Sequence, residues 1–543
     1  MSISPNELPP VPVWQAALAV APALASALGA LSASRADAAA AWRTARRALT
    51  LVLLLAVAAL AALVVAGRGQ ALGVRIDAVG VVVALLVAFI GWVIVRYSQP
   101  YLAGERGETG YVRWLLVTLA AVLLVVTSNH LLVLALAWSA TSLALHRLLT
   151  FFADRPAALA AAHKKFVLGR VADAAMLAAC ALLALEFGTL HIDAVVARAG
   201  ALDTLPALAQ AAVVLVAAAV LLKCAQLPFH GWLIQVMEAP TPVSALLHAG
   251  VVNLGGFVLI RLAPLVAEVP LAAGLLVVAG ALTAAVAALV MMTRISIKVT
   301  LAWSTCAQMG FMLMQCGLGL WEMALLHLVA HSLYKAHAFL AAGGVVRHAL
   351  VQQLAPAAPP PTPASLLAAA AGSLLMTGIA ALAFGLRPGA QPALWVMGGI
   401  VGLALTPMVQ GSLRGTTTGA GARAVATAFA LACIYFALHT LLRGWVAPAD
   451  AMPAAPWWIV VAVAFAALFA LQYTVTARPN GALAARLYPW VYGGLFLDER
   501  FSHTMFRLWP PPQPRTAPAG SQVLVRGRSA APQSNPANFR RAA

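Results

Sequence analysis

The chain is a succession of long apolar runs, separated by short stretches that contain charged residues, Gly or Pro. Each run approaches the roughly 20 apolar residues that one helix needs to cross a bilayer. We expect fifteen such helices, at residues 13–31, 48–66, 76–95, 112–128, 130–152, 166–187, 206–226, 241–262, 270–292, 297–317, 321–345, 365–386, 391–411, 422–442 and 456–477. The pattern therefore predicts an all-α polytopic membrane protein with 14–15 transmembrane helices.

Composition supports a membrane protein, because 63% of the residues are hydrophobic and only 9% are charged. The net charge of +18 is spread over loops and a Pro-rich tail, so we expect it to face anionic membrane lipid and not nucleic acid. Lys and Arg are concentrated in the loops after the odd-numbered runs, even without the arginine-rich tail. This asymmetry predicts an external N-terminus and a cytoplasmic C-terminus. The first run lacks a basic region before it and a cleavage site after it, so we interpret it as a helix and not as a signal peptide.

The apolar runs and the segments between them define five parts of the chain. They are N-terminal transmembrane helices at 1–111, a motif-bearing core at 112–350, a Pro-rich linker at 351–364, C-terminal transmembrane helices at 365–478, and a basic tail at 479–543. The linker contains APAAPPPTP, which favours an extended chain. From about residue 510 the tail consists mainly of Pro, Ser, Ala and Arg, so we expect disorder there.

One stretch of the core interrupts the apolar pattern. The run 206–222 ends at Lys223, and Pro228 follows five residues later, which predicts a break in the helix next to a lysine. His230 and Glu238 add further polar groups to the same stretch. Because a charge near the bilayer centre costs about 2.5 to 3.5 kcal/mol, such residues are functional candidates. The alternative is that Lys223 extends from the end of a helix to the membrane surface.

The next helix carries one titratable residue. Pro242 fits the first turn of a helix, which places His248 about two turns inside it. A lone histidine in such a helix is either a packed core residue or a proton carrier. Its neighbours along the chain do not decide between these two interpretations.

A second set of basic residues lies on one predicted helix. His327, His331 and Lys335 are spaced at i, i+4 and i+8, so they share one face, and a proton can pass between neighbours directly or through one water. A zinc site is the rival interpretation, but the only nearby carboxylate, Glu322, lies in a predicted loop. We therefore favour a proton relay and predict no metal in this chain.

Two further groups support the relay less directly. Lys298 follows Arg294 at i+4 near a helix start, which fits either a topology charge or a relay residue. Arg170 and Asp173 are spaced at i, i+3 and are expected to form an ion pair that offsets their burial, in a structural more than a catalytic role.

Several functional motifs are missing from the sequence. It contains no GxxxxGK[ST], no GxGxxG after a strand and no cysteine ligand set, and its five cysteines all lie in apolar segments. We therefore expect no cofactor in this chain and no enzymatic activity of its own. An ion gradient is the expected source of energy.

The core resembles the proton-translocating antiporter-like family that respiratory complex I membrane subunits share with Mrp-type antiporters. The residues that carry this resemblance are 223–228 (KCAQLP), 238–248 (EAPTPVSALLH), 304–310 (STCAQMG) and the basic face at 327–335, within a similarity that covers about 115–345. The resemblance implies a fold of inverted five-helix repeats with broken helices. It also implies a central hydrated proton path at Lys223, His248, Lys298, His327, His331 and Lys335.

The sequence also departs from the complex I pattern. Complex I subunits carry a glutamate after the tryptophan of the fifth helix and a lysine in the twelfth, whereas here Ser139 follows Trp138 and no lysine follows Lys335. No Asp or Glu occurs between Glu322 and Asp450. The exit half of the usual proton path therefore has no obvious counterpart in this chain.

This combination, together with residues 143–146 (LALH) and the segment 488–510, resembles DabB, the family of membrane subunits of Dab-type inorganic carbon pumps. That resemblance implies a DabA-like, zinc-binding, carbonic-anhydrase-like partner that carries the catalytic chemistry. By the resemblance, a cation gradient, with protons as the expected cation, would then drive the uptake of CO2 or bicarbonate across a bacterial inner membrane. The alternative is a proton-pumping membrane subunit of a complex I-type NADH:quinone oxidoreductase or an Mrp-type cation/proton antiporter.

Overall fold

The computed structural model describes residues 8–345, 362–387, 391–414, 418–446 and 456–510. Most of the predicted linker and the predicted disordered tail beyond 510 lie outside these residues. The five-part division of the chain therefore stays a prediction.

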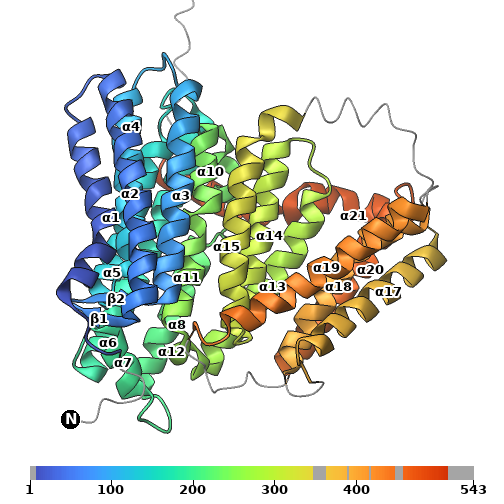
Figure 1. The fold of residues 1–543 in the computed structure, drawn as a ribbon. Coiled ribbons are helices and arrows are strands. Elements are labelled where there is room, and N and C mark those ends of the chain that lie inside the picture. Colours follow the sequence, from blue (N-terminus) through green and yellow to red (C-terminus); the bar gives the residue numbers. More distant parts are fainter. Residues whose placement is uncertain (1–7, 346–361, 388–390, 415–417, 447–455, 511–543) are drawn as a thin grey trace, which may run out of the picture.

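The described residues form a predominantly helical bundle (Figure 1). The N-terminal half contains α1 (Val13–Ala33), α2 (Ala38–Ala66), α3 (Ala78–Tyr101), α4 (Glu108–Thr127), α5 (Leu131–Leu149), α6 (Pro156–Phe187), α7 (Ile192–Ala199), α8 (Ala207–Lys223), α9 (Gly231–Gln235), η1 (Val236–Glu238), α10 (Thr241–Ala249), η2 (Val251–Asn253), α11 (Leu254–Arg261) and α12 (Ala263–Ala267). The remainder contains α13 (Pro270–Met291), α14 (Ile297–Gly317), α15 (Trp321–Leu340), η3 (Ala342–Gly344), α17 (Pro363–Ala383), α18 (Pro392–Arg414), α19 (Thr418–Leu442), α20 (Pro456–Ala477), α21 (Ala482–Tyr492), η4 (Gly494–Phe496) and α22 (Leu497–Leu508). A two-stranded antiparallel hairpin, β1 (Gly69–Ala71) and β2 (Val74–Ile76), connects α2 to α3.

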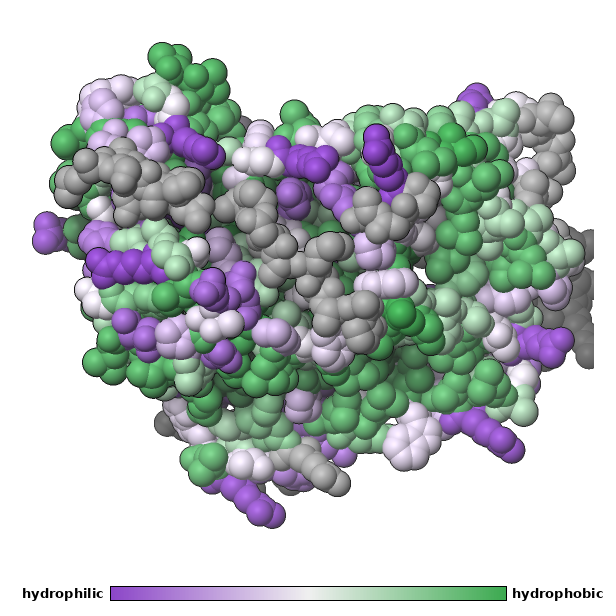
Figure 2. Space-filling view, turned by 90° about the horizontal axis from the view of Figure 1, so that it is seen from below, coloured by the Kyte–Doolittle hydropathy of each residue, from purple (hydrophilic) through white to green (hydrophobic). Residues whose placement is uncertain are grey.

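Twelve helices among the described residues are long and apolar enough to cross a membrane, which confirms the all-α polytopic fold. The predicted runs also include α8, which is shorter, and α14 and α15, which are of spanning length and carry the lysine and histidine residues of the core. Hydrophobic residues cover much of the outline of the molecule when it is viewed end-on (Figure 2). This distribution fits a surface that faces lipid.

Two helices each begin about three turns earlier than the apolar pattern predicts. The pattern predicts starts at 48 and 166, whereas α2 starts at Ala38 and α6 starts at Pro156. Both extensions are rich in alanine and contain basic residues, so they continue a helix without being apolar. As a result Lys164 and Lys165 lie inside α6, and not in a loop.

The predicted break after Lys223 is confirmed, because α8 ends there and α9 begins only at Gly231. The peptide bond before Pro228 is cis, and Ala225 has a φ of 53°. Backbone groups freed by the break find new partners, since the Leu227 amide donates to Thr283 Oγ1 of α13 at 3.1 Å. Neighbouring protein thus satisfies an irregular backbone at this depth.

The next predicted helix, at 241–262, is not continuous. It is divided at Gly250 into α10 and α11, with the short 3₁₀ segment η2 between them. The side chain of Asn253 donates to the carbonyl oxygen of Ala249 at 3.1 Å and so occupies an acceptor that the interrupted helix leaves free. Sequence analysis missed this second break because no proline marks it.

The helices pack in neighbouring groups (Figure 1). Helices α1–α6 pack against one another, α10 and α11 pack on α15, and α13 packs along α14, where Gly280 and Gly310 let the two backbones touch. Helices α17–α20 form a further group beside α13–α15. Near the C-terminus, α22 contacts α6, and Arg294 donates to the carbonyl oxygen of Tyr492 at 2.6 Å, which holds α21 in place.

A buried ion pair ties the β-hairpin to three helices. Asp77 caps α3 by accepting from the Gly80 amide at 2.8 Å, and it pairs with Arg75 at 2.7 Å and with Arg261 of α11. Arg261 also donates to the carbonyl oxygen of Val126 at the end of α4. Burial opposes ionisation of Asp77, but Arg261 and Arg75 outweigh it and hold the pKa of this carboxyl well below its usual range.

We expect Asp77→Asn to destabilise the protein by about 3 kcal/mol, because the amide keeps the helix cap but leaves Arg261 buried without a counter-charge. Unfolding in mixed detergent micelles measures this change, with Asp203→Asn in an exposed loop as the matched control. The difference from wild type should be the same at pH 6 and pH 8, since the carboxylate is ionised at both. It should shrink only as the pH falls below about 4, where the unfolded carboxyl binds a proton. Equal stability of Asp77→Asn and Asp203→Asn would contradict the assignment.

Candidate functional site

Lys223 is buried at the broken end of α8 and does not extend to the surface. Its Nζ lies 2.6 Å from Asp173 Oδ1 of α6, and each of the two side chains is 9% exposed. The ammonium group also lies 4.0 Å from the ring centroid of Trp138 and 3.4 Å from the carbonyl oxygen of the same residue. Charge, aromatic face and backbone oxygen together offset the burial of the lysine.

Asp173 serves two cations at once. Arg170 lies 2.6 Å from Asp173 Oδ2, which is the ion pair predicted from the i, i+3 spacing. Ser139 of α5 donates to the same oxygen at 3.0 Å and accepts from Arg170 at 3.1 Å. In this chain the carboxylate beside Lys223 therefore comes from α6, and the residue after Trp138 on α5, Ser139, contributes a hydroxyl group to it.

This cluster can exist in two charge states. With Lys223 protonated, two cations share one carboxylate, and the cluster carries one net positive charge. When Lys223 loses its proton, the pair of Arg170 and Asp173 still neutralises itself. Neither state leaves a buried carboxylate without a partner, so proton exchange at Lys223 does not require the cluster to come apart.

A second buried cluster forms where α10 meets α15. His248 is fully buried and stacks on Phe339 with 4.5 Å between ring centroids. Lys335, also fully buried, donates to the carbonyl oxygen of Leu301 on α14 at 3.1 Å. His331 lies within Coulombic range of His248, Lys335 and His327, and the rings of His327 and His331 are 5.8 Å apart.

The structure thus brings His248 together with the basic face of α15. Both ring nitrogens of His248 and both of His331 are buried without a hydrogen-bond partner among the described residues. A buried polar atom without a hydrogen-bond partner lowers the stability of the folded protein by about 1–3 kcal/mol. A purely packing role therefore does not explain why histidines occupy these two positions. Transfer of protons between these groups stays a prediction.

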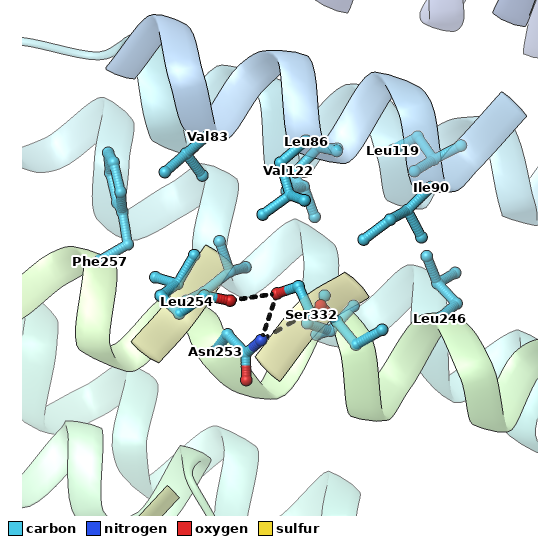
Figure 3. A pocket seen from close by; sticks show the side chains of 15 residues that line it. Val83, Leu86, Ile90, Leu119, Val122, Leu246, Asn253, Leu254, Phe257 and Ser332 are labelled. Atoms are coloured by element: carbon cyan, nitrogen blue, oxygen red, sulfur yellow. Dashed lines mark hydrogen bonds between the residues drawn. The ribbon is translucent and has the colours of Figure 1, made fainter. Parts of the chain in front are cut away.

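Two small cavities flank the break between α10 and α11. One, of about 30 Å³, is lined by Lys223, Lys165, Trp138 and the residues Leu247 and Val251 on either side of His248. This volume is enough for about two waters next to Lys223, and the cavity reaches the chain neighbours of His248. The other cavity is apolar except for Asn253 and Ser332, whose side chains bond at 2.7 Å and so tie η2 to α15 (Figure 3).

The remaining predicted residues lie outside these clusters. Lys298 is half-buried in the first turn of α14, and its side chain forms no hydrogen bond or ion pair within the described residues. Glu238 is half-exposed and lies 3.8 Å from Arg155, so it is a surface residue. His230 is buried and packs against Trp303 with 4.9 Å between ring centroids.

Sequence analysis missed the two lysines of α6. Lys165 donates to the carbonyl oxygen and to Oγ of Ser142, at 2.6 and 2.8 Å, inside the bundle. Lys164 lies 3.0 Å from Asp498 of α22 and is 1% exposed. A proline at the first helical position, Pro156, is the signal that would have extended α6 to include both lysines.

Comparison with known proteins places the same region in a family. Residues 128–358 match the family described as NADH:quinone oxidoreductase/Mrp antiporter, transmembrane, and this range includes every candidate relay residue. A probable inorganic carbon transporter subunit DabB from Hydrogenovibrio crunogenus is 54% identical over 290 residues, which span 53% of this chain and 56% of that protein. A probable inorganic carbon transporter subunit DabB2 from Halothiobacillus neapolitanus is 40% identical over 453 residues, 82% of each chain. The NADH-quinone oxidoreductase subunit L of Mycobacterium tuberculosis is 34% identical over 288 residues, 52% of this chain and 44% of that protein.

Two solved structures resemble the fold. The Mrp complex from Dietzia sp. DQ12-45-1b aligns with a TM-score of 0.53 and 25% identity over 92% of this chain and 55% of that chain. The membrane-bound sulfane sulfur reductase, an archaeal respiratory membrane complex, aligns with a TM-score of 0.55 and 17% identity over 90% of this chain and 99% of that chain. The second likeness concerns the fold alone.

A double-mutant cycle tests the buried pair of Asp173 and Lys223. We expect Asp173→Asn to destabilise the protein because it leaves Lys223 and Arg170 without a counter-charge, and Lys223→Met to destabilise it less, because Asp173 loses one of its two cations but keeps Arg170. The double variant should be more stable than the sum of the two predicts, with a coupling energy of about 1–3 kcal/mol. Unfolding in mixed micelles gives the four free energies, and additive effects would show that the two side chains do not interact.

Proposed function

The chain belongs to the DabB family of membrane subunits, and from this we propose that it is the energy-coupling membrane subunit of an inorganic carbon pump. In this role it conducts cations, most simply protons, down their gradient and so drives the uptake of CO2 or bicarbonate. Relatives of this chain carry the name of probable inorganic carbon transporter subunits. The protein lies in a bacterial inner membrane, with its C-terminus in the cytoplasm.

The buried pair of Lys223 and Asp173 is the observation that carries this proposal. Asp173 keeps Arg170 as a partner whether or not Lys223 carries a proton, whereas both cations at the structural cluster of Asp77 are arginines, which stay protonated. The excess charge belongs to Lys223, the group that can release a proton. Intramembrane titratable residues of this kind mark ion pathways.

The protons follow the order of the two clusters. Lys223 takes up a proton beside Asp173 and releases it through the small cavity toward His248. From there the proton reaches His331, which has His327 and Lys335 as its neighbours on α15. Because these groups are all cationic when protonated, binding of one proton disfavours the next, so protons leave one after another.

Chemistry on inorganic carbon is assigned to a partner protein. This chain acts as a transporter subunit, not as an enzyme, and the partner is a DabA-like, carbonic-anhydrase-like protein that binds zinc. The partner hydrates CO2 while proton flow through this chain keeps the reaction in one direction. The chain itself needs no cofactor for this role.

A second candidate function is supported by the fold. The likeness to the Mrp complex covers 92% of this chain, and subunit L of a NADH-quinone oxidoreductase is 34% identical over about half of it. A cation/proton antiporter, or a proton-pumping subunit of a redox complex, would use the same buried lysine and histidines. Purification of the tagged chain from its native membrane separates the three cases: a zinc protein supports the carbon pump, flavin and iron–sulfur subunits support the redox complex, and other antiporter subunits support the antiporter.

A growth assay tests the role of Lys223. Expressed with its partner gene in a host that lacks carbonic anhydrase, the wild-type chain should restore growth in air. Lys223→Ala should abolish the rescue, because alanine can neither bind a proton nor balance Asp173. His337→Ala, an exposed histidine on α15, is the matched control and should leave growth unchanged.

Membrane abundance of each variant is measured by immunoblot, so that a loss of protein is not taken for a loss of function. Rescue by Lys223→Ala at the wild-type level would show that protons do not pass through this lysine.

A further inference from the structure

An open groove lies between α2 and α3, at the end of the bundle that carries the α1–α2 and α3–α4 loops. The two helices pack side by side (Figure 1). The groove has a volume of about 610 Å³, and three arginines line it, Arg46 and Arg47 from α2 and Arg96 from α3. All three side chains are exposed, and none belongs to the buried clusters of the candidate site.

The three arginines have no anionic partner in the described part of the chain. Helices α2 and α3 contain no Asp or Glu, and no carboxylate of the described residues lies within ion-pair distance of Arg46, Arg47 or Arg96. By contrast, Arg170 and Arg261 each pair with a carboxylate. Arg46 and Arg96 lie within Coulombic range of each other, so an anion in the groove would be attracted by cations from both helices.

Contacts within α3 hold Arg96 in position. Its Cζ lies 3.5 Å from the ring centroid of Trp92, and its Nη1 donates to the carbonyl oxygen of Trp92 at 3.2 Å. These contacts use one face of the guanidinium group and one of its five N–H groups. The remaining donors can bind phosphate oxygens, for which the planar guanidinium group is well suited.

The groove changes from charged to apolar along α2. Thr50 lies beyond the arginines, and Leu51 and Leu54 form the part that extends toward the bilayer. Arg47, Leu51 and Leu54 are spaced at i, i+4 and i+7, so they share one face of the helix. The two leucines are 49% and 62% exposed, and only 28% of the apolar window of α2 is buried. This face of α2 therefore meets lipid.

We propose that the groove is a binding site for an anionic phospholipid. Arg46, Arg47 and Arg96 bind the phosphate, and an acyl chain lies along Leu51 and Leu54. A soluble phosphate would contact only the charged half of the groove, whereas a lipid uses both halves. Because three cations line the site, cardiolipin, which has two phosphates, binds more tightly than phosphatidylglycerol, which has one.

Membrane orientation alone does not explain this arrangement. Arg35, Arg106 and Arg113 are exposed arginines at the same end of the bundle, and they do not line the groove. They favour the orientation of the chain as well as the groove arginines do. The meeting of arginines from two helices above an exposed apolar face is accounted for by a lipid ligand. The site does not depend on the proposed function, since a chain that conducts no protons can also bind lipid.

Native mass spectrometry tests the site. The full chain is purified in detergent with its bound partner subunits and mixed with cardiolipin, phosphatidylglycerol or phosphatidylcholine at equal concentrations. The wild type should bind cardiolipin most tightly and phosphatidylcholine, which has no net charge, least tightly. Arg46→Gln, Arg47→Gln and Arg96→Gln should each weaken the binding of cardiolipin about fivefold, the contribution of one basic residue near a membrane surface. The triple variant should lose most of the preference for anionic lipid.

A matched triple variant controls for overall charge. Arg35→Gln, Arg106→Gln and Arg113→Gln together remove the same charge from the same end of the bundle, and this protein should keep the wild-type preference. An equal loss in both triple variants would show that overall charge attracts the lipid, and an unchanged preference in the groove variant would place the lipid elsewhere. Displacement of cardiolipin by an equal concentration of soluble glycerol phosphate would show recognition of phosphate alone. Each of these three results overturns the proposal.

Photo-crosslinking tests the site in the wild-type protein, so its result does not depend on the folding of a variant. The chain is reconstituted into phosphatidylcholine vesicles that contain phosphatidylglycerol with a photoreactive acyl chain. Mass spectrometry should find the label on the peptide of Leu51 and Leu54, and unlabelled cardiolipin should lower this labelling at least several-fold. Val460 and Val463, exposed on α20, are the internal control for lipid that surrounds the protein unspecifically. If cardiolipin lowers the labelling of both peptides equally, the groove is not a specific site.

Discussion

The central constraint on this structure is that a charge inside a bilayer must have a partner within the protein. Asp173 supplies that partner for Lys223 and Arg170 at once, and Asp77 does the same for Arg75 and Arg261 near the β-hairpin. Each carboxylate therefore connects helices that are distant in the sequence. The difference between the two clusters lies in the cation: two arginines keep their protons, so the cluster at Asp77 is fixed, whereas the lysine beside Asp173 can change its charge.

The breaks in the helices serve the same constraint. At the end of α8, the chain leaves the helix immediately after Lys223, which gives the ammonium group access to a cavity instead of a packed helix surface. At η2, Asn253 repairs the interrupted backbone and at the same time bonds Ser332, the neighbour of His331 on α15. A movement of η2 would therefore displace His248 relative to α15. The two breaks place irregular backbone next to the buried titratable groups, as in transporters built around discontinuous helices.

Local features of this site were predictable from the sequence, and long-range pairings were not. Pro228 breaks a helix because its ring removes a backbone donor and clashes with the preceding turn. The spacing of His327, His331 and Lys335 places them on one face of a helix. Both features can therefore be predicted from short stretches of sequence. The partner of Lys223 lies 50 positions earlier in the chain, and no local rule selects Asp173 over other carboxylates. Lys165 was missed for a different reason: apolar periodicity marks where a helix is hydrophobic, whereas α6 extends beyond its apolar part. Glycine alone marks the break at Gly250, and glycine is common within membrane helices, so it carries little information there.

The distribution of carboxylates also limits where protons can go. No Asp or Glu occurs between Glu322 and Asp450, so α17, α18 and α19 have no anion of their own to stabilise a buried cation. Helix α20 is the most exposed of the spanning helices, with 6% of its apolar window buried, and it presents hydrophobic residues such as Val460 and Val463. These helices are thus suited to contact lipid or another apolar surface, and less suited to carry charge. After this gap, Asp498 of α22 is the carboxylate that pairs with the core. Its ion pair with Lys164 attaches α22 to α6. The C-terminal segment is therefore held on the side of the bundle on which Lys223 lies, by contacts with α6 and with α9.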